Sequence, residues 1–132
     1  MRPALIILTL VLFGFTACRK QKFEKQLEGN YTGVFYRTAP SIDYTLARVT
    51  LRLNQDSYAG TSDIAKYPAI CRGNWETDND VIRFTNECPW TAEFDWTFIL
   101  NGEYKYELNG SHLKIIRSYS NGTSDIYELE KN

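Results

Sequence analysis

The side chains that could perform acid–base or metal chemistry are few and scattered in this sequence. His112 is the only histidine, whereas a metal site needs several histidine, cysteine or carboxylate ligands. Glu93 and Asp95 could imitate a catalytic carboxylate pair, but in an alternating strand both would face solvent, opposite the aromatic face. No serine has the context of a nucleophile, and no glycine-rich loop precedes a helix to hold phosphate. We therefore expect no enzyme, no cofactor and no metal.

Cys18 closes an N-terminal segment that is typical of export signals. Arg2 is followed by an apolar run over residues 4–15 and then by the small residues of FTAC (15–18). The run is too short for a comfortable membrane span, so we predict a signal peptide over residues 1–17. FTAC resembles a bacterial lipobox, which implies lipidation of Cys18; an ordinary signal peptide with an incidental cysteine is the alternative. Lipid chains on Cys18 would anchor the protein to a membrane.

About 115 residues remain after this segment, which is enough for one domain. Residues 19–25 carry four bases and one acid, whereas residues 26–132 carry ten bases and fifteen acids. A basic stretch beside a lipid anchor suits an anionic membrane surface, and the acidic remainder argues against nucleic acid. We expect a lipidated basic linker with a short helix over 18–28 and a domain over 29–132. The predicted location is the bacterial outer membrane, facing the periplasm, with cell-surface exposure as the alternative.

The other two cysteines bracket the segment CRGNWETDNDVIRFTNEC (71–88). In an oxidising periplasm we expect a disulfide between Cys71 and Cys88, which leaves no thiol nucleophile. A two-residue turn at Asn79 and Asp80 would set both cysteines opposite each other on an apolar face. The same register gives these further pairs: Trp75 with Phe84, Thr77 with Ile82, Arg72 with Glu87, and Glu76 with Arg83. A calcium loop at Asp78–Asp80 is the alternative, but it lacks the later glutamate.

The C-terminal third contains three Asn-Gly pairs, at 101–102, 109–110 and 121–122, between alternating runs. Asn-Gly is a strong hairpin signal. The expected cross-strand pairs are Phe98 with Tyr106, Tyr106 with Leu113, Ile115 with Tyr127, Lys114 with Glu128, and His112 with Glu130 on the outer face. Residues 30–38, 43–54 and 57–63 read as three further strands. The chain is therefore predicted to be all-β, an antiparallel up-and-down meander of eight or nine strands that closes into a small barrel.

A short helix leading into Gly29-Asn30-Tyr31, and a last strand of the IYELEK kind (126–131), resemble the lipocalin-like small barrels of bacterial lipoproteins. Lipocalins begin with Gly-x-Trp, on which a late arginine packs. The resemblance covers most of residues 29–132 and implies that Arg117 stacks on Tyr31; a pair between Arg117 and Asp125 is the alternative. Many lipoproteins of this kind have no assigned activity, and the domain is shorter than a typical lipocalin.

Aromatic residues make up 14% of the chain, and most are expected inside the barrel. They either form a filled core or line a cavity for a small hydrophobic ligand. The ligand-lining candidates are Tyr31, Phe35, Trp75, Phe84, Trp96, Phe98, Tyr104, Tyr106, Arg117 and Tyr127. The competing hypothesis is an interaction or inhibitor module that contacts an envelope protein through rim loops, with Pro89 and Trp90 as partner-contact candidates. Of these two hypotheses, the sequence favours the ligand-binding barrel.

Overall fold

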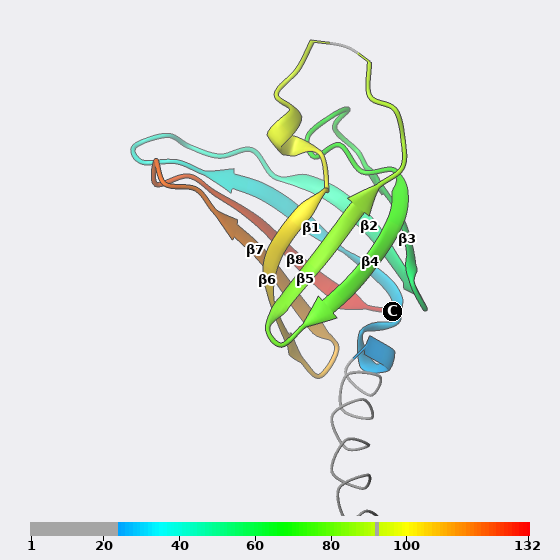
Figure 1. Cartoon of the computed structure of the whole chain (residues 1–132). Helices are drawn as coiled ribbons and strands as arrows, with labels where there is room; N and C mark the ends of the chain where they lie inside the picture. The colour runs from blue at the N-terminus through cyan, green and yellow to red at the C-terminus, as the bar shows by residue number, and fades with distance from the viewer. Residues whose placement is uncertain (1–23, 92) are drawn as a thin grey trace, which may run out of the picture.

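A computed structural model describes residues 24–91 and 93–132, and Figure 1 shows their eight antiparallel strands closing into one barrel. Each strand pairs with the next in the chain, and β1 pairs with β8. The predicted all-β, up-and-down barrel is therefore confirmed. The elements are β1 (Gly29–Thr38), β2 (Ala47–Asn54), β3 (Ser57–Ser62), β4 (Arg72–Asp78), β5 (Val81–Asn86), η1 (Trp96–Phe98), β6 (Gly102–Asn109), β7 (His112–Ser118) and β8 (Ser124–Lys131).

The two ends of the barrel differ (Figure 1). The base carries tight turns and a short helix over residues 24–27, whose Leu27 is buried and accepts a hydrogen bond from the Tyr31 hydroxyl at 2.7 Å. The other end, which we call the rim, carries the connections 39–46, 63–71, 87–101 and 119–123. The predicted signal peptide (1–17) and Cys18 lie outside the described residues, as does most of the predicted linker.

The cysteine-bracketed hairpin has the predicted register. Trp75 lies opposite Phe84 across β4 and β5, and a disulfide joins Cys71 to Cys88. Of the two expected charge pairs on its outer face, only Glu76 with Arg83 forms an ion pair, at 3.0 Å. The side chain of Glu87 instead accepts a hydrogen bond from Asn74, at 2.8 Å (the Nδ2–Oε1 distance).

The C-terminal hairpins agree with the prediction in part. Across β7 and β8, Ile115 lies opposite Tyr127 and Lys114 opposite Glu128, as expected. Across β6 and β7 the register differs by two residues, because the turn is Gly110-Ser111 and Tyr106 lies opposite Ile115. A shift of two leaves each side chain on its predicted face, since side chains alternate with a period of two.

The expected strand before Asn101 is absent. Residues 96–98 form the 3-10 helix η1, and β6 pairs with β5 instead, with Ile82 opposite Tyr104. Asp95 begins the helix, since its carboxylate accepts a hydrogen bond from the backbone N–H of Thr97 at 2.9 Å. Such a cap favours helical over extended backbone, so the alternating aromatics of this segment do not mark a strand. The expected pair of Phe98 with Tyr106 is therefore wrong.

The barrel interior consists of aromatic and aliphatic side chains in mutual contact. Strand β2 shows the pattern most simply, because its residues alternate between buried and exposed. Tyr58, Phe84, Tyr104, Tyr127 and Phe35 form a continuous series of ring contacts with centroid separations of 4.8–6.2 Å. Edge-to-face and tilted arrangements of this kind add to the stability gained from burial alone.

Candidate functional site

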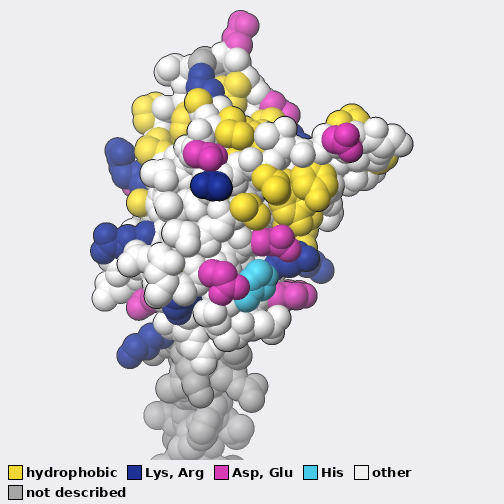
Figure 2. Space-filling view, turned by 180° about the vertical axis from the view of Figure 1, so that it is seen from behind, with side chains coloured by type: hydrophobic (Ala, Val, Ile, Leu, Met, Phe, Trp, Pro, Cys, Tyr) yellow, Lys and Arg dark blue, Asp and Glu magenta, His cyan; other side chains and the backbone are white. Residues whose placement is uncertain are grey.

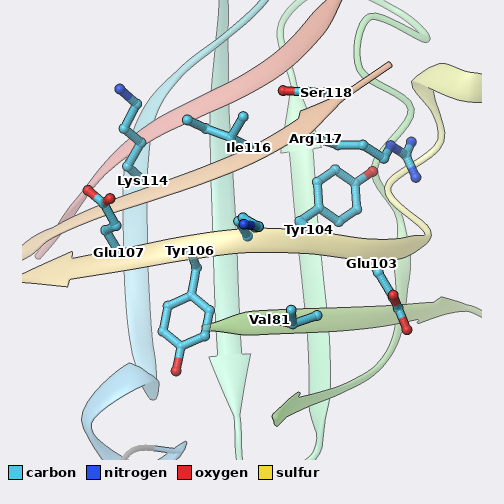
Figure 3. A pocket seen from close by; sticks show the side chains of 10 residues that line it. Val81, Glu103, Tyr104, Tyr106, Glu107, Lys114, Ile116, Arg117 and Ser118 are labelled. Carbon is cyan, nitrogen blue, oxygen red and sulfur yellow. The ribbon is translucent and has the colours of Figure 1, made fainter. Parts of the chain in front are cut away.

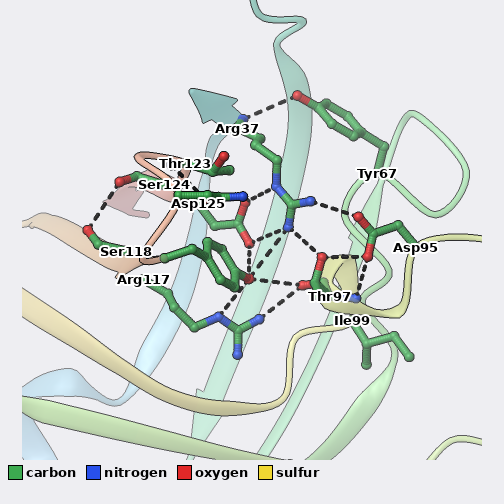
Figure 4. A network of polar contacts seen from close by, with 12 residues as sticks. Arg37, Tyr67, Asp95, Thr97, Ile99, Arg117, Ser118, Thr123, Ser124 and Asp125 are labelled. Atoms are coloured by element: carbon green, nitrogen blue, oxygen red, sulfur yellow. Dashed lines mark hydrogen bonds and ion pairs between the residues drawn. The ribbon is translucent and has the colours of Figure 1, made fainter. Parts of the chain in front are cut away.

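Arg37 forms the centre of a polar network at the rim of the barrel (Figure 4). Its guanidinium makes two hydrogen bonds to the Asp125 carboxylate, at 2.6 and 2.8 Å. The side chain of Arg37 is 16% exposed and that of Asp125 is 3% exposed, so the ion pair is largely removed from water. The Tyr119 hydroxyl donates a further hydrogen bond to Asp125 at 2.8 Å. Paired N–H donors on one carboxylate fix both position and orientation.

The same guanidinium holds the long connection between β5 and β6. Arg37 donates to Asp95 at 3.0 Å and to the Thr97 hydroxyl at 2.9 Å, and it lies 3.8 Å from the Phe98 ring centre. Burial lowers the pKa of Arg37, but hydrogen bonds to Asp125 and its charge outweigh this, so the pKa stands above its ordinary value. Hydrogen bonds from Thr97, followed by the charge of Arg37, lower the pKa of Asp95.

Arg117 lies in this network and not at the base of the barrel. Its guanidinium donates to the backbone carbonyls of Asn101 and Thr97 at 2.7 and 2.9 Å, and it lies 4.3 Å from the Tyr104 ring centre. Stacking of Arg117 on Tyr31 is therefore wrong: Lys131 lies over that ring instead, at 5.6 Å. Arg117 is opposite Asp125 in the β7–β8 register, as predicted, but the carboxylate pairs with Arg37.

Three aromatic side chains of the 87–101 connection form what we call the rim aromatic cluster: Trp90, Phe94 and Trp96. Their neighbouring ring centres are 6.0 and 6.3 Å apart. Trp90 is half-buried, and its Nε1 donates to the Asn86 side chain at 3.4 Å. Trp96 is 58% exposed, although sequence alternation placed it inside the barrel. That expectation fails because Trp96 is in η1, on the outside of the rim.

A groove of about 690 Å³ runs beside this cluster. Cys88, which is held by its disulfide to Cys71, lines the groove together with both predicted contact residues, Pro89 and Trp90. The complete lining is Asn86, Cys88, Pro89, Trp90, Trp96, Thr97, Ile99, Asn101, Arg117 and Tyr119. We call this the rim groove. The rim groove is therefore lined by both partner-contact candidates and by two of the ligand-lining candidates, Trp96 and Arg117.

The remaining ligand-lining candidates lie in or against the core. Tyr31, Phe35, Trp75, Phe84, Tyr104 and Tyr127 are buried, while Phe98 and Tyr106 are half-buried against them. Burial raises the pKa of the Tyr31 hydroxyl to about 12. Burial also raises that of Tyr104, although Arg117 opposes the shift. Among the described residues, the Trp75 indole Nε1 is buried and has no hydrogen-bond partner.

The candidate catalytic and metal-binding residues are not brought together. His112 lies opposite Glu130 on the outer face, as predicted, with 2.8 Å between Nδ1 and Oε1. Glu93 is exposed, whereas Asp95 is engaged by Arg37 and Thr97. Within residues 24–91 and 93–132, no three His, Cys, Asp or Glu side chains are placed to hold a metal ion.

Sequence reasoning missed Arg37 and the rim aromatic cluster, in which Phe94 contacts both Trp90 and Trp96. Arg37 lies opposite Asp125 only because β1 pairs with β8, across 88 residues of chain. A usable signal for the loop was its length, since the 15 residues between β5 and β6 exceed an ordinary hairpin connection. Long ordered loops of that kind commonly carry function.

Comparison with known proteins gives no relative: no protein-family model, curated protein or solved structure matches the chain. In the described part of the chain, no helix is long and apolar enough to cross a membrane.

Proposed function

We propose that this protein is a lipid-anchored binding module, not an enzyme, whose rim groove holds a segment of another bacterial envelope protein. The observation that carries the proposal is the rim aromatic cluster, in which an exposed Trp96 stands beside a positioned Trp90. Buried tryptophan and arginine anchors supply most of the energy of protein interfaces. An exposed tryptophan on a well-held loop is suited to become such an anchor.

The loop that carries the cluster is held at several points, which lowers the entropic cost of binding. The disulfide fixes its start, and Arg37 and Arg117 fix the segment around Thr97. Backbone hydrogen bonds between Ala69 and its neighbours Phe98 and Leu100, at 2.9 and 3.0 Å, attach it to the adjacent connection. A partner would therefore meet a surface that is already ordered.

The lipid anchor predicted at Cys18 would direct this surface away from the membrane. Only five residues separate Cys18 from Glu24, where the described chain begins at the base, and the six Cα–Cα steps between them reach about 20 Å at most. With the base near the bilayer, the rim at the opposite end points into the periplasm. This arrangement favours a soluble or envelope-spanning protein partner over the anchoring membrane itself.

Site-specific photocrosslinking in cells that produce the full chain tests this function. A photoreactive residue at Trp96 should give a discrete adduct, whereas the same residue at Thr50, exposed on β2, should not. Once the partner is identified, Trp90→Ala should weaken its binding by roughly 30-fold, the effect of a hot-spot residue of about 2 kcal/mol. Equal adducts from both positions, or unchanged affinity of the variant, would refute the proposal.

A small apolar ligand inside the barrel is the second candidate, and one observation favours it. The Trp75 indole N–H is buried without an acceptor among the described residues, and such a group costs about 1–3 kcal/mol. A polar atom of a bound molecule would relieve that cost. Native mass spectrometry of the protein purified from membranes distinguishes the candidates: extractable extra mass supports a ligand, and a clean apo mass opposes it.

A further inference from the structure

One row of outward-facing side chains, apolar and half-buried except for Lys105, makes a stripe across the outside of the barrel. Strand registers set Tyr36 beside Ile126, Ile126 beside Ile116, and Ile116 in line with Val81 through Lys105. Their sequence neighbours Phe35, Tyr127, Ile115 and Ile82 face the core. The outer face of a small antiparallel barrel is normally polar, so this stripe suggests a covered surface.

An arm extends one end of the stripe. The arm is the connection 39–46, which Figure 1 shows projecting to the side of the barrel together with the 119–123 turn. Ile42, Tyr44 and Leu46 are 68%, 53% and 55% exposed, and they are three of the four large hydrophobic side chains exposed in the described chain. Tyr44 stacks on Tyr36 with 4.8 Å between ring centres, which joins the arm to the stripe.

Figure 2 shows hydrophobic side chains gathered on this face, beside the projecting arm and above the single histidine and its acidic neighbours. Contiguous exposed apolar patches on soluble domains commonly mark interaction sites.

A hollow of about 520 Å³ lies at the opposite end of the stripe (Figure 3). Val81, Tyr106 and Ile116 contribute apolar surface. Three cations (Lys105, Lys114 and Arg117) and two carboxylates (Glu103 and Glu107) give the lining one net positive charge. The arm has the complementary composition, because its apolar side chains accompany the acid Asp43. Arm and hollow therefore match each other in chemistry, although they are at opposite ends of the stripe.

Their positions are related by symmetry about the boundary between β7 and β8. The arm follows β1, which is two strands from that boundary on one side. The hollow lies over β6, which is two strands from it on the other, and extends onto β7. A two-fold axis parallel to the strands at this boundary would place Ile116 against Ile126 of a second copy. It would also bring the arm of each copy over the hollow of the other.

The same axis makes the surrounding charges complementary. Lys114 lies opposite Glu128 within one chain, and His112 lies opposite Glu130. Rotation about the β7–β8 boundary exchanges the two strands, so Lys114 would face Glu128 of the second copy. Opposite charges at the edge of an interface fix the register of the two copies and disfavour other partners.

We propose that the chain forms a two-fold dimer through this stripe, with reciprocal seating of the arm in the hollow of the second copy. The interface is isologous, because the same surface serves both copies. The barrel surface curves away from a flat contact, and the projecting arm spans the space that this curvature leaves. The rim groove shares Arg117 with the hollow, but its other lining residues lie outside the stripe and the arm, so each dimer presents two grooves.

Sedimentation equilibrium of the purified full chain in mild detergent tests the dimer. We expect a dimer mass at high protein concentration, and Ile126→Glu should raise the dimer dissociation constant by roughly 100-fold or more, because it buries a charge whose cross-strand neighbours, Tyr36 and Ile116, are uncharged. Thr50→Glu, an exposed change on β2 outside the stripe, is the matched control. Circular dichroism checks that both variants fold.

Cysteine crosslinking gives a second measurement that does not depend on a disruptive substitution. The double variant Tyr44→Cys/Val81→Cys should form a covalent dimer under mild oxidation, whereas Thr50→Cys/Val81→Cys should not. A monomer at every concentration, without specific crosslinking, would overturn the proposal. Binding of the monomer to anionic vesicles that Ile126→Glu abolishes would also overturn it, and would assign the stripe to a lipid surface.

Discussion

The ion pair between Arg37 and Asp125 is expected to be the strongest electrostatic determinant of stability in this barrel. Asp125→Ala removes both acceptors of the bidentate pair and leaves the Arg37 guanidinium, whose side chain is only 16% exposed, with Asp95 as its remaining charged partner. Breaking a fully buried pair costs about 3–5 kcal/mol. Because Arg37 retains some solvent and Asp95, we expect the lower value, about 3 kcal/mol.

For a domain of this size that loss lowers the melting temperature by roughly 10–15 °C. Circular dichroism during heating and urea unfolding followed by tryptophan fluorescence would measure it. Glu76→Gln is the matched control, because its partner Arg83 is half exposed, and exposed pairs contribute less than about 1 kcal/mol.

A double variant tests the physical cause. In Arg37→Met/Asp125→Leu no charge is left buried and unpaired, so this variant should be more stable than Asp125→Ala alone. If Asp125→Ala unfolds at the same urea concentration as Glu76→Gln, the pair does not stabilise the fold. If the double variant is less stable than Asp125→Ala, orphaned charge is not the reason for the loss.

Three further predictions concern the rest of the barrel. Replacing Cys71 and Cys88 by serine releases a loop with a sequence separation of 17 and should cost about 3 kcal/mol; an unchanged urea midpoint would contradict this. The Tyr31 pKa, raised from 10.0 to about 12, favours the neutral phenol in the folded state. The contribution of Tyr31 to the free energy of unfolding is therefore complete below pH 10 and is lost as the pH rises to about 12. Urea unfolding at a series of alkaline pH values should show this loss. Equal stability at pH 10 and pH 12 would contradict it. Gly73→Ala would place a Cβ 1.9 Å from a backbone oxygen of β5, so we expect it to destabilise by about 3 kcal/mol or more. Gly110→Asn, with open space around that position, should leave the melting temperature nearly unchanged.

The elements that sequence reasoning predicted correctly are those whose information is local. Trp75 opposite Phe84 and Ile115 opposite Tyr127 follow from an alternating pattern on both sides of a short turn. A one-residue error would turn every apolar side chain outward, so the pattern allows few registers. An error of two residues has no such penalty, which is why the β6–β7 register was displaced while its faces were correct.

The segment around Trp96 shows where the local pattern fails. FDWTFIL (94–100) alternates like a strand, but Asp95 caps a 3-10 helix and Arg37 binds that cap from a distant strand. The rim groove depends on the same 3-10 helix, since residues of this loop line it together with Arg117. Pro89 and Trp90 could be proposed as contact residues from sequence, but not the groove that they line.

By itself the sequence determined the alternation of the strands that form, the turn between β4 and β5, and the disulfide, because each depends on residues close in the chain. Only the tertiary structure decided which cation meets Asp125. The β7–β8 hairpin offers Arg117, which is eight residues away in sequence, but barrel closure brings Arg37 to the other side of the carboxylate. The two hydrogen bonds that Arg37 makes with Asp125 depend on closure between the first and last strands. No local sequence pattern reveals a contact between residues that are 88 positions apart in the chain. The same closure of the barrel positions the rim loop and the stripe on the outer face.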